Sequence, residues 1–307
     1  VCSSMLLNFP SGAFSIHWNW RASAEETEES VEGIAIDATN FPDETFRTYV
    51  QENFDTTADG ILTEGELEQV TSINVSSKGI SDLTGVEYFT ALKELYCGGN
   101  NLTELDVRQN TALHLLYCYN NNLTALDLSQ NPALTDLACS NNTYSIALTG
   151  GTFDLSTLPG NFDVSKASNW TNATVDGNTL TVTDPKTDVT YTYDLGNGKT
   201  ATFTLHPASC TLTESMVEAI PVQSHTGSEV IPDVTVKYGT RILQKDTDYT
   251  VSYAGNEQVG TAKAILTGIG SFAGEITVPF EIGVAIDATN FPDETFRTYV
   301  KENIDTT

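Results

Sequence analysis

The sequence has few basic residues: its 307 residues include 14 Lys and Arg against 41 Asp and Glu, a formal net charge of −27. A chain this acidic repels phosphate backbones and anionic lipids, so nucleic acids and membrane surfaces are poor candidates for its partners. It also lacks any run of about 18 apolar residues, so we expect no membrane insertion. Calcium, a cationic partner or simple solubility remain compatible with the charge.

Catalytic patterns are missing as well. The four histidines are scattered at positions 17, 114, 206 and 225, and neither H-E-x-x-H nor G-x-S-x-G occurs. Pairs of acids are uninformative about acid–base catalysis in a chain with so many carboxylates. The glycine-rich segment 268–274 lacks the dinucleotide-binding spacing and is interpreted as a turn. We therefore predict that this chain is not an enzyme.

Only five cysteines are present, and three of them occupy one register of a repeat. Cys97, Cys118 and Cys139 follow one another at intervals of 21 residues. We expect these thiols to point inward and to pack as small hydrophobic groups, because a ladder of thiols offers no tetrahedral metal geometry. The other two, Cys2 and Cys210, are isolated and are assigned no role.

The segment 92–142 contains one pattern written almost three times. Its first copy consists of Leu92, Leu95, Cys97, Asn100, Leu102, Leu105 and Asn110. The second consists of Leu113, Leu116, Cys118, Asn121, Leu123, Leu126 and Asn131, and a third begins with Leu134, Leu137, Cys139 and Asn142. This is the pattern of leucine-rich repeats, each a short strand plus a return, which stack into a solenoid. We expect the asparagines 100, 121 and 142 to form an internal ladder that satisfies backbone groups.

The strand of each repeat predicts which side chains face solvent. Because strand side chains alternate, the positions between the consensus residues face outward on the concave side. In the central repeats these positions predict a ligand-binding cluster of Glu94, Tyr96, Leu115, Tyr117, Tyr119 and Asp136. Tyrosine supplies contact area with a polar group and is frequent in binding hot spots. The alternative is that neighbouring domains or adjacent tyrosines cover the cluster.

Residues 33–70 predict a helical unit that contains a calcium loop. Asn40 can cap a first helix, and residues 55–66 match D-x-[DN]-x-[DN]-G-x5-E everywhere except at Thr57. Calcium needs about six to eight oxygen ligands, and the expected ones are Asp55, Thr57, Asp59, the carbonyl of Ile61, Thr63 and Glu66. We expect a structural Ca2+ ion bound with modest affinity. The alternative is a metal-free helical cap, since the first repeat of a solenoid needs cover.

The remaining segments complete a mainly β, multidomain prediction. Alternating strands around the turn Asn197-Gly198 predict a small antiparallel β module, and about six later strands predict an Ig-like β-sandwich. Residues 283–307 repeat residues 33–57 with only three substitutions, which indicates a repeating unit of a longer protein or a local duplication with its own docking role. The predicted parts are a leader remnant and acidic linker (1–32), an EF-hand-like cap (33–70), leucine-rich repeats (71–146), a capping β module (147–207), an Ig-like sandwich (208–283) and the start of a second cap (284–307).

The order of cap, 21- to 22-residue repeats and Ig-like domain resembles the internalins and leucine-rich-repeat surface proteins of Gram-positive gut bacteria. The phrases Leu-Thr-Glu-Leu-Asp-Val (102–107) and Leu-Thr-Ala-Leu-Asp-Leu (123–128) carry most of this resemblance, which covers residues 33–206. It implies a secreted or cell-wall protein that binds a ligand on its concave face. The family's cap resembles an EF-hand without needing metal, whereas this loop keeps a nearly complete ligand set.

Three functions follow from these observations. The first is non-enzymatic adhesion or recognition, with a protein or glycan ligand on the concave repeat face. The second is a structural spacer in a wall-bound protein, in which the β modules hold another part away from the surface. The third is an accessory carbohydrate-binding region of a secreted hydrolase, in which the tyrosines stack on sugar rings.

Overall fold

The computed structural model describes residues 33–304, and its folded part is mainly β. The predicted leader remnant and linker (1–32), Cys2 and residues 305–307 lie outside the described residues. Within them the α-helices are α1 (Glu44–Phe54), α2 (Glu64–Gln69) and α3 (Glu294–Asn303). No helix in this part of the chain is long and apolar enough to cross a membrane.

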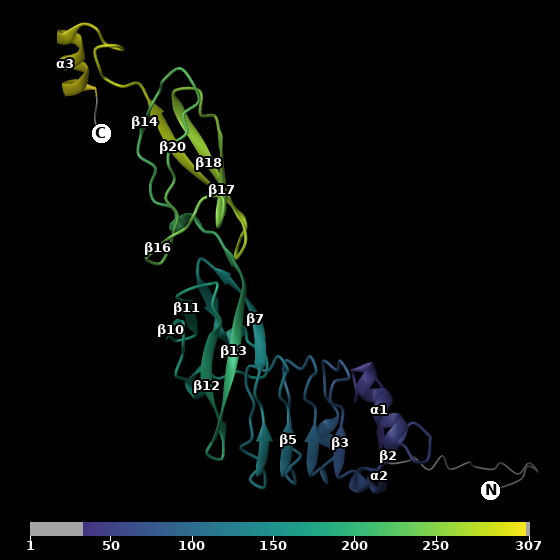
Figure 1. The fold of residues 1–307 in the computed structure, drawn as a ribbon. Coiled ribbons are helices and arrows are strands. Elements are labelled where there is room, and N and C mark those ends of the chain that lie inside the picture. The colour runs from purple at the N-terminus through teal and green to yellow at the C-terminus, as the bar shows by residue number, and fades with distance from the viewer. Residues whose placement is uncertain (1–32, 305–307) are drawn as a thin grey trace, which may run out of the picture. The chain divides into compact units, whose positions relative to one another are not determined.

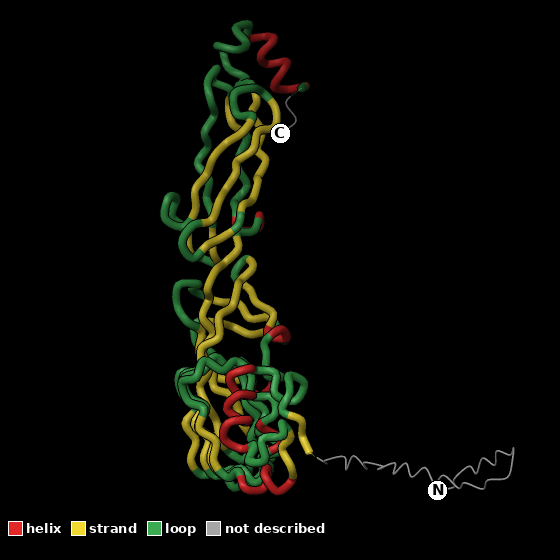
Figure 2. Tube along the Cα trace, turned by 90° about the vertical axis from the view of Figure 1, so that its right-hand side faces the viewer, coloured by secondary structure: helices red, strands yellow, loops and turns green. Residues whose placement is uncertain are grey.

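The repeats form a short solenoid, as the sequence predicts. Its strands are β3 (Ser72–Asn74), β4 (Glu94–Tyr96), β5 (Leu115–Tyr117) and β6 (Asp136–Ala138). They pair in parallel in the order β3-β4-β5-β6 (Figure 1), and Leu95 lies opposite Leu116, which lies opposite Leu137. Figure 2 shows these strands side by side along one side of the solenoid. In-register parallel pairing places equivalent residues of successive repeats in rows.

Thiols and asparagines fill two inner rows of the solenoid. Cys97, Cys118 and Cys139 are free and buried, and burial raises the pKa of the Cys97 thiol. Asn100 donates from Nδ2 to the carbonyls of Val75 (2.8 Å) and Cys97 (2.9 Å). The equivalent asparagines 121 and 142 repeat this arrangement one and two repeats later. Both rows therefore serve packing and backbone satisfaction, as predicted.

Residues 33–70 pack against the first repeat, which comprises residues 71–91, contains β3 and precedes the copy that begins at Leu92. The N-cap of α1 is Asp43, which accepts hydrogen bonds from the N–H groups of Thr45 and Phe46 (both 3.0 Å). The prediction of Asn40 as the cap was wrong, because Asn40 instead donates to the carbonyl of Ala35. Phe41, Phe46 and Val50 are fully buried. The segment is tied together by β1 (Gly33–Ala35) and β2 (Ile61–Thr63), which pair antiparallel.

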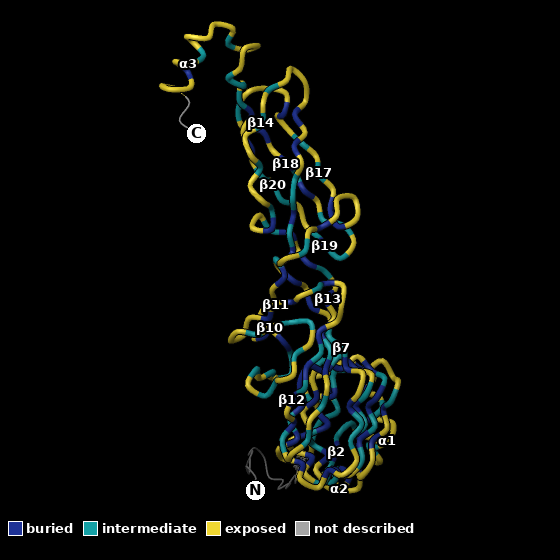
Figure 3. The backbone as a smooth tube through the Cα atoms, turned by 60° about the vertical axis from the view of Figure 1, so that its left-hand side comes forward, coloured by how far each residue is buried: buried dark blue, intermediate teal, exposed yellow. Residues whose placement is uncertain are grey.

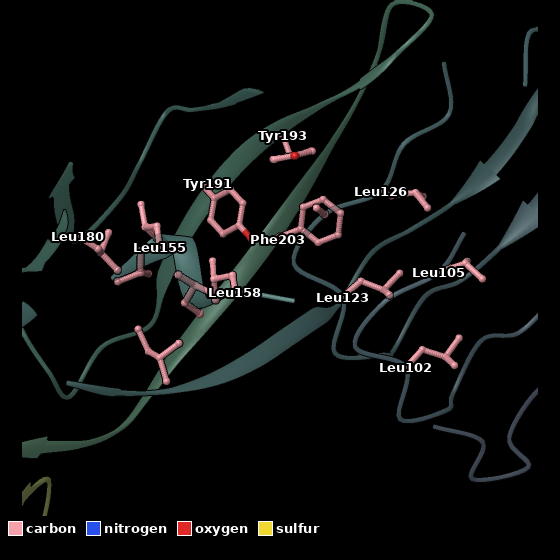
Figure 4. Packing of buried hydrophobic residues seen from close by; sticks show 14 of the residues in the cluster. Leu102, Leu105, Leu123, Leu126, Leu155, Leu158, Leu180, Tyr191, Tyr193 and Phe203 are labelled. Carbon is pink, nitrogen blue, oxygen red and sulfur yellow. The ribbon is translucent and has the colours of Figure 1, made fainter. Parts of the chain in front are cut away.

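A mixed sheet follows the last repeat. It contains β7 (Asn142–Thr149), β8 (Thr152–Asp154), β9 (Ala167–Ser168), β10 (Ala173–Asp176), β11 (Thr179–Val182), β12 (Val189–Gly196) and β13 (Lys199–Thr211). The strands around Asn197-Gly198 pair antiparallel as predicted, but the sheet as a whole is not antiparallel, because β7 continues from the repeats and pairs in parallel with β13. The hydroxyl of Tyr191 donates to the carbonyl of Thr124 (2.6 Å). Figure 4 shows the repeat leucines continuing toward Tyr191 and Phe203, so one apolar core spans repeats and sheet.

A second sheet contains β14 (Gln223–Ser224), β17 (Tyr249–Ala254), β18 (Gly260–Gly268) and β20 (Glu275–Gly283), in the order β14-β20-β18-β17. A hairpin of β15 (Lys237–Tyr238) and β16 (Arg241–Ile242) lies apart from it, and β19 (Phe272–Ala273) pairs with β13. The strand predicted near 230–238 forms only at its end. Pro232 has no N–H to donate, and its carbonyl accepts from the Tyr253 hydroxyl rather than from a neighbouring strand.

Candidate functional site

The structure brings the six predicted concave residues together on one face of the repeat sheet. Glu94 and Tyr96 lie on β4, Leu115 and Tyr117 on β5, and Asp136 on β6, while Tyr119 follows β5. Register places Glu94, Leu115 and Asp136 in one row and Tyr96 beside Tyr117 in the next. We call these six residues the tyrosine cluster.

The three tyrosine rings contact one another in sequence. Tyr96 and Tyr117 meet edge to face, with centroids 5.4 Å apart and planes at 87°. The Tyr117 and Tyr119 centroids are 6.4 Å apart. All three side chains are half-buried. The adjacent tyrosines therefore cover part of one another, while the rest of each ring remains accessible to a ligand.

The ring of Tyr119 packs directly against Gly98. A Cβ atom on Gly98 would lie 2.8 Å from Cζ of the Tyr119 ring, closer than real side chains approach. Gly98 was not among the predicted site residues. The signal was present, because Gly98 stands 21 residues before Tyr119, at the same position of the repeat. A glycine at a position that is tyrosine in the next repeat leaves room for that tyrosine's ring.

Carboxylates fix two of the rings. Tyr117 donates from its hydroxyl to Oδ2 of Asp136 (3.0 Å), and Tyr96 donates to Oε2 of Glu94 (3.3 Å). The hydrogen bond to Asp136, followed by burial, raises the pKa of Tyr117. Burial, followed by the charge of Glu94, raises the pKa of Tyr96. Both phenols therefore stay protonated at neutral pH and act as hydrogen-bond donors.

The tyrosine cluster is an open face rather than a pocket. A hollow of about 670 Å³ lies elsewhere on the repeats and includes Leu105, Leu126 and Arg108 in its lining. Its Arg108 is engaged with Asp106 at 2.6 Å. Small molecules are usually bound in concave sites that bury most of their surface. An open aromatic face instead suits a protein surface or the flat side of a sugar ring.

The predicted calcium loop is organised around the buried carboxylate of Glu66. Oε1 of Glu66 accepts hydrogen bonds from the N–H and hydroxyl of Thr56 (both 2.7 Å), and Oε2 accepts from the N–H and hydroxyl of Thr63 (both 2.9 Å). Burial opposes ionisation, but these bonds outweigh it and lower the pKa of Glu66 to about 2. Thr63 and Glu66 form a capping box at the start of α2. The T-x-x-E spacing was a visible signal for this role.

The other proposed calcium ligands are also engaged. Asp55 accepts from the N–H groups of Asp59 (3.2 Å) and Gly60 (2.9 Å), and Asp59 accepts from the N–H of Ile61 (2.9 Å). The Thr57 hydroxyl lies 3.4 Å from Oδ1 of Asp55. In the described residues no group of three or more His, Cys, Asp or Glu is placed to hold a metal. Both carboxylate oxygens of Glu66 already accept hydrogen bonds. Calcium binding therefore stays a prediction that requires Glu66 to exchange these donors for the cation.

Comparisons with known proteins agree with the repeat assignment over part of the chain. No protein-family model matches. Over 70 residues the chain is 39% identical to Internalin J of Listeria monocytogenes serotype 4b (strain F2365). This matched segment makes up 23% of this chain and 8% of Internalin J. The match supports an internalin-like leucine-rich-repeat protein. The chain thus spans less than a tenth of that curated relative.

Solved structures match with low overall similarity. The functional domain of InlJ from Listeria monocytogenes, which includes a cysteine ladder, is 34% identical with a TM-score of 0.34, over 38% of this chain and 26% of that one. The CBM51-2 and INT domains of Clostridium perfringens ZmpB are 19% identical with a TM-score of 0.29, over 54% and 35% of the two chains. Scores of this size support no conclusion about function.

Proposed function

We propose that this chain is a non-enzymatic recognition protein of the bacterial cell surface, secreted or attached to a Gram-positive wall, and that the tyrosine cluster binds a protein or glycan ligand. The observation that carries the proposal is the set of three contacting tyrosine rings, two of them fixed by carboxylates, on adjacent in-register strands. The sequence similarity to Internalin J supports the surface location.

The arrangement favours binding because the rings are already ordered. Two phenols are held by Glu94 and Asp136, and Tyr119 rests on Gly98. Ordering a side chain on binding costs about 0.5–1.5 kcal/mol, so a preformed surface avoids part of that cost. Tyrosine faces also attract cations, and the adjacent carboxylates strengthen that preference. A ligand with a sugar ring or a basic side chain fits this surface.

Calcium in the cap is a separate proposal, and it rests on the residue pattern 55–66 rather than on the hydrogen bonds of the loop. We also infer that residues 33–70 act as an EF-hand-like cap and that residues 208–283 form an Ig-like module. The burial of Phe41 and Phe46 supports the first inference. The four-stranded sheet with a separate hairpin supports the second.

Two alternative functions remain as proposals. A structural spacer is favoured by the small number of repeats, because four three-residue strands give a small concave face. An accessory carbohydrate-binding region of a secreted hydrolase is favoured by the ability of tyrosine rings to stack on sugars. Both differ from the leading proposal in what the tyrosine cluster binds.

Glycan and protein arrays probed with the intact chain test the function. A hit should be lost in the Tyr117→Ala, Tyr119→Ala double variant and retained in Ile242→Ala, which removes an exposed large side chain from β16. A glycan hit with this behaviour supports sugar recognition, and a protein hit supports adhesion. Binding that survives the double variant, or no hit at all, would contradict a ligand on the tyrosine cluster and favour the spacer.

A further inference from the structure

One local fold occurs twice in this chain. Asp287 accepts hydrogen bonds from the N–H groups of Thr289 and Asn290 (both 2.9 Å), as Asp37 does 250 residues earlier for the equivalent pair (2.9 and 3.0 Å). Asp293 caps α3 by accepting from the N–H of Phe296 (2.8 Å), as Asp43 caps α1. The guanidinium groups of Arg297 and Arg47 both donate to a phenylalanine carbonyl six residues earlier. The shared sequence therefore specifies this local structure by itself.

The two copies differ in what covers them. Phe46 is fully buried, whereas its equivalent Phe296 is 54% exposed. Tyr49 is half-buried, whereas Tyr299 is 55% exposed. Figure 3 shows α3 largely in the colour of exposed residues. The second copy thus carries the same apolar face as the first, without the surface that buries it.

The first copy shows which apolar surface fits this face. Phe41 packs against the rings of Tyr88 (centroids 5.9 Å apart) and Phe89 (6.4 Å), and Phe54 packs against Phe89 (5.4 Å). A Cβ atom on Gly85 would lie 2.3 Å from the Phe41 ring, so only glycine leaves room for it. Tyr88, Phe89 and Gly85 all belong to the first repeat.

Polar contacts make the fit specific. Oδ2 of Asp43 accepts from the N–H (2.9 Å) and the hydroxyl (3.2 Å) of Ser81. The side-chain carbonyl of Asn40 accepts from the Tyr88 hydroxyl (3.0 Å). Ser81 and Tyr88 thus offer hydrogen-bond donors to two side chains that precede or cap α1.

The residues of α1 and its preceding turn that make these contacts recur in the second copy. Asn290, Phe291 and Asp293 correspond to Asn40, Phe41 and Asp43, and only Phe54 is changed, to Ile304. Phe46 and Tyr49 of the covered face recur as Phe296 and Tyr299. We propose that residues 283–304 are a second docking unit, whose partner is the uncovered first repeat of a leucine-rich-repeat solenoid with equivalents of Ser81, Gly85 and Phe89. The first repeat of this chain already carries residues 33–54, so a different repeat must be the partner.

Two variants of the intact chain test the proposal. The triple substitution Ile34→Val, Gln51→Lys, Phe54→Ile gives the first cap the sequence of the second. If the second sequence can dock on a first repeat, hydrogen exchange at residues 44–54 should stay at least tenfold slower than at residues 294–304. Assigned NMR signals must report the exchange, because the two segments then have the same sequence. The Phe46→Ala variant, which removes a fully buried ring, should lose this protection. Exchange in the triple variant as fast as at residues 294–304 would overturn the proposal.

An extended chain tests docking itself. In this variant a second copy of residues 58–211 is appended after Thr307. A first repeat then follows residues 283–307 in the sequence, just as the native first repeat follows residues 33–57. Peptides that contain Lys301 distinguish the second copy by mass, and their exchange should slow at least tenfold relative to the 307-residue chain. Phe296→Ala should abolish the slowing, and Thr298→Ala, at a position exposed in both copies, should retain it. Equal exchange in the extended and 307-residue chains, or slowing that survives Phe296→Ala, would contradict the proposal.

Discussion

The hydroxyl of Tyr117 on β5 donates a 3.0 Å hydrogen bond to Oδ2 of Asp136 on the neighbouring strand β6. This bond joins successive repeats through their outward-facing side chains, whereas the consensus residues join them through the core. It also fixes the central ring of the tyrosine cluster. The bond can be removed without touching the core, because Asp136 is exposed.

Removing Asp136 should lower the pKa of Tyr117. The hydrogen bond to this carboxylate is the largest cause of the raised pKa, and its charge adds to the effect. In Asp136→Ala we expect the pKa of Tyr117 to fall toward its ordinary value of 10.0, as measured by NMR titration of labelled tyrosine. Glu94→Ala is the control, and it should move the pKa of Tyr96 instead. An unchanged Tyr117 pKa in Asp136→Ala would show that the bond is absent in solution.

Glu66 should stabilise the cap without any metal. Glu66→Gln places an amide N–H₂ against N–H and hydroxyl donors, so we expect the free energy of unfolding to fall by about 1–3 kcal/mol at pH 7 in chelator. The folded-state pKa is lowered, so this stability is present above pH 4.5 and is lost as the pH falls toward about 2. Urea unfolding at several pH values measures both effects.

The exposed Glu68 provides the matched control for Glu66, since it lies on the same helix. Glu68→Gln should change the free energy of unfolding by less than about 0.5 kcal/mol. A Glu66→Gln variant as stable as Glu68→Gln at pH 7 would contradict the central role of the buried carboxylate. The difference in unfolding free energy between the unsubstituted chain and Glu66→Gln should shrink as the pH falls toward 2. A difference that does not shrink would contradict the lowered pKa of Glu66.

Calcium binding to residues 55–66 is decided by titrating Ca2+ into chelator-treated chain in a calorimeter. We expect binding heat and a higher melting temperature, with modest affinity, because Glu66 must exchange hydrogen bonds for the ion. Asp59→Ala should abolish both effects, since Asp59 is a proposed ligand. If neither heat nor a shift in melting temperature appears, calcium is not part of this protein and the loop is a hydrogen-bonded cap.

Gly98→Ala should disturb the tyrosine cluster more than the fold. The added Cβ would lie 2.8 Å from the Tyr119 ring, so the ring must move. We expect affinity for an array hit to fall at least tenfold, while the free energy of unfolding changes by at most about 1–3 kcal/mol. Tyr119→Ala provides the matched background. When Gly98→Ala is added to Tyr119→Ala, we expect no additional effect on affinity. An additional loss would show that Gly98→Ala does not act through the Tyr119 ring.

The repeats could be predicted because period and burial agree along the chain. Leu95, Leu116 and Leu137 recur at 21 residues and lie in register, so the outward positions of Tyr96 and Tyr117 followed directly. Two features depend on distances that a sequence does not state. They are the hydrogen bonds of these tyrosines to acids on their own and neighbouring strands, and the packing of the Tyr119 ring against Gly98. The identity of the outward-facing residues in the tyrosine cluster was therefore predictable, whereas the contacts among them were not.

Errors arose where tertiary contacts decided between local choices. Asn40 and Asp43 are both good helix caps, and the choice fell to Asp43, whose carboxylate also accepts from Ser81. Residues 230–238 have strand-like composition, yet the carbonyls of Pro232 and Val234 accept hydrogen bonds from the hydroxyls of Tyr253 and Tyr249 instead of from a strand. Neither partner is near in sequence, so propensity alone could not find it.

The parallel pairing of β7 with β13 sets an order of events in folding. Asn142 is the ladder asparagine of the last repeat and the first residue of β7, and it lies opposite Phe203, 61 residues later in the chain. Loop closure must precede such a pairing, which makes non-local parallel contacts slow to form. During synthesis the repeats can stack as they emerge, but β7, which follows them, lacks its parallel partner until β13 has left the ribosome. That interval is when the chain is most prone to associate with other chains through an open strand edge.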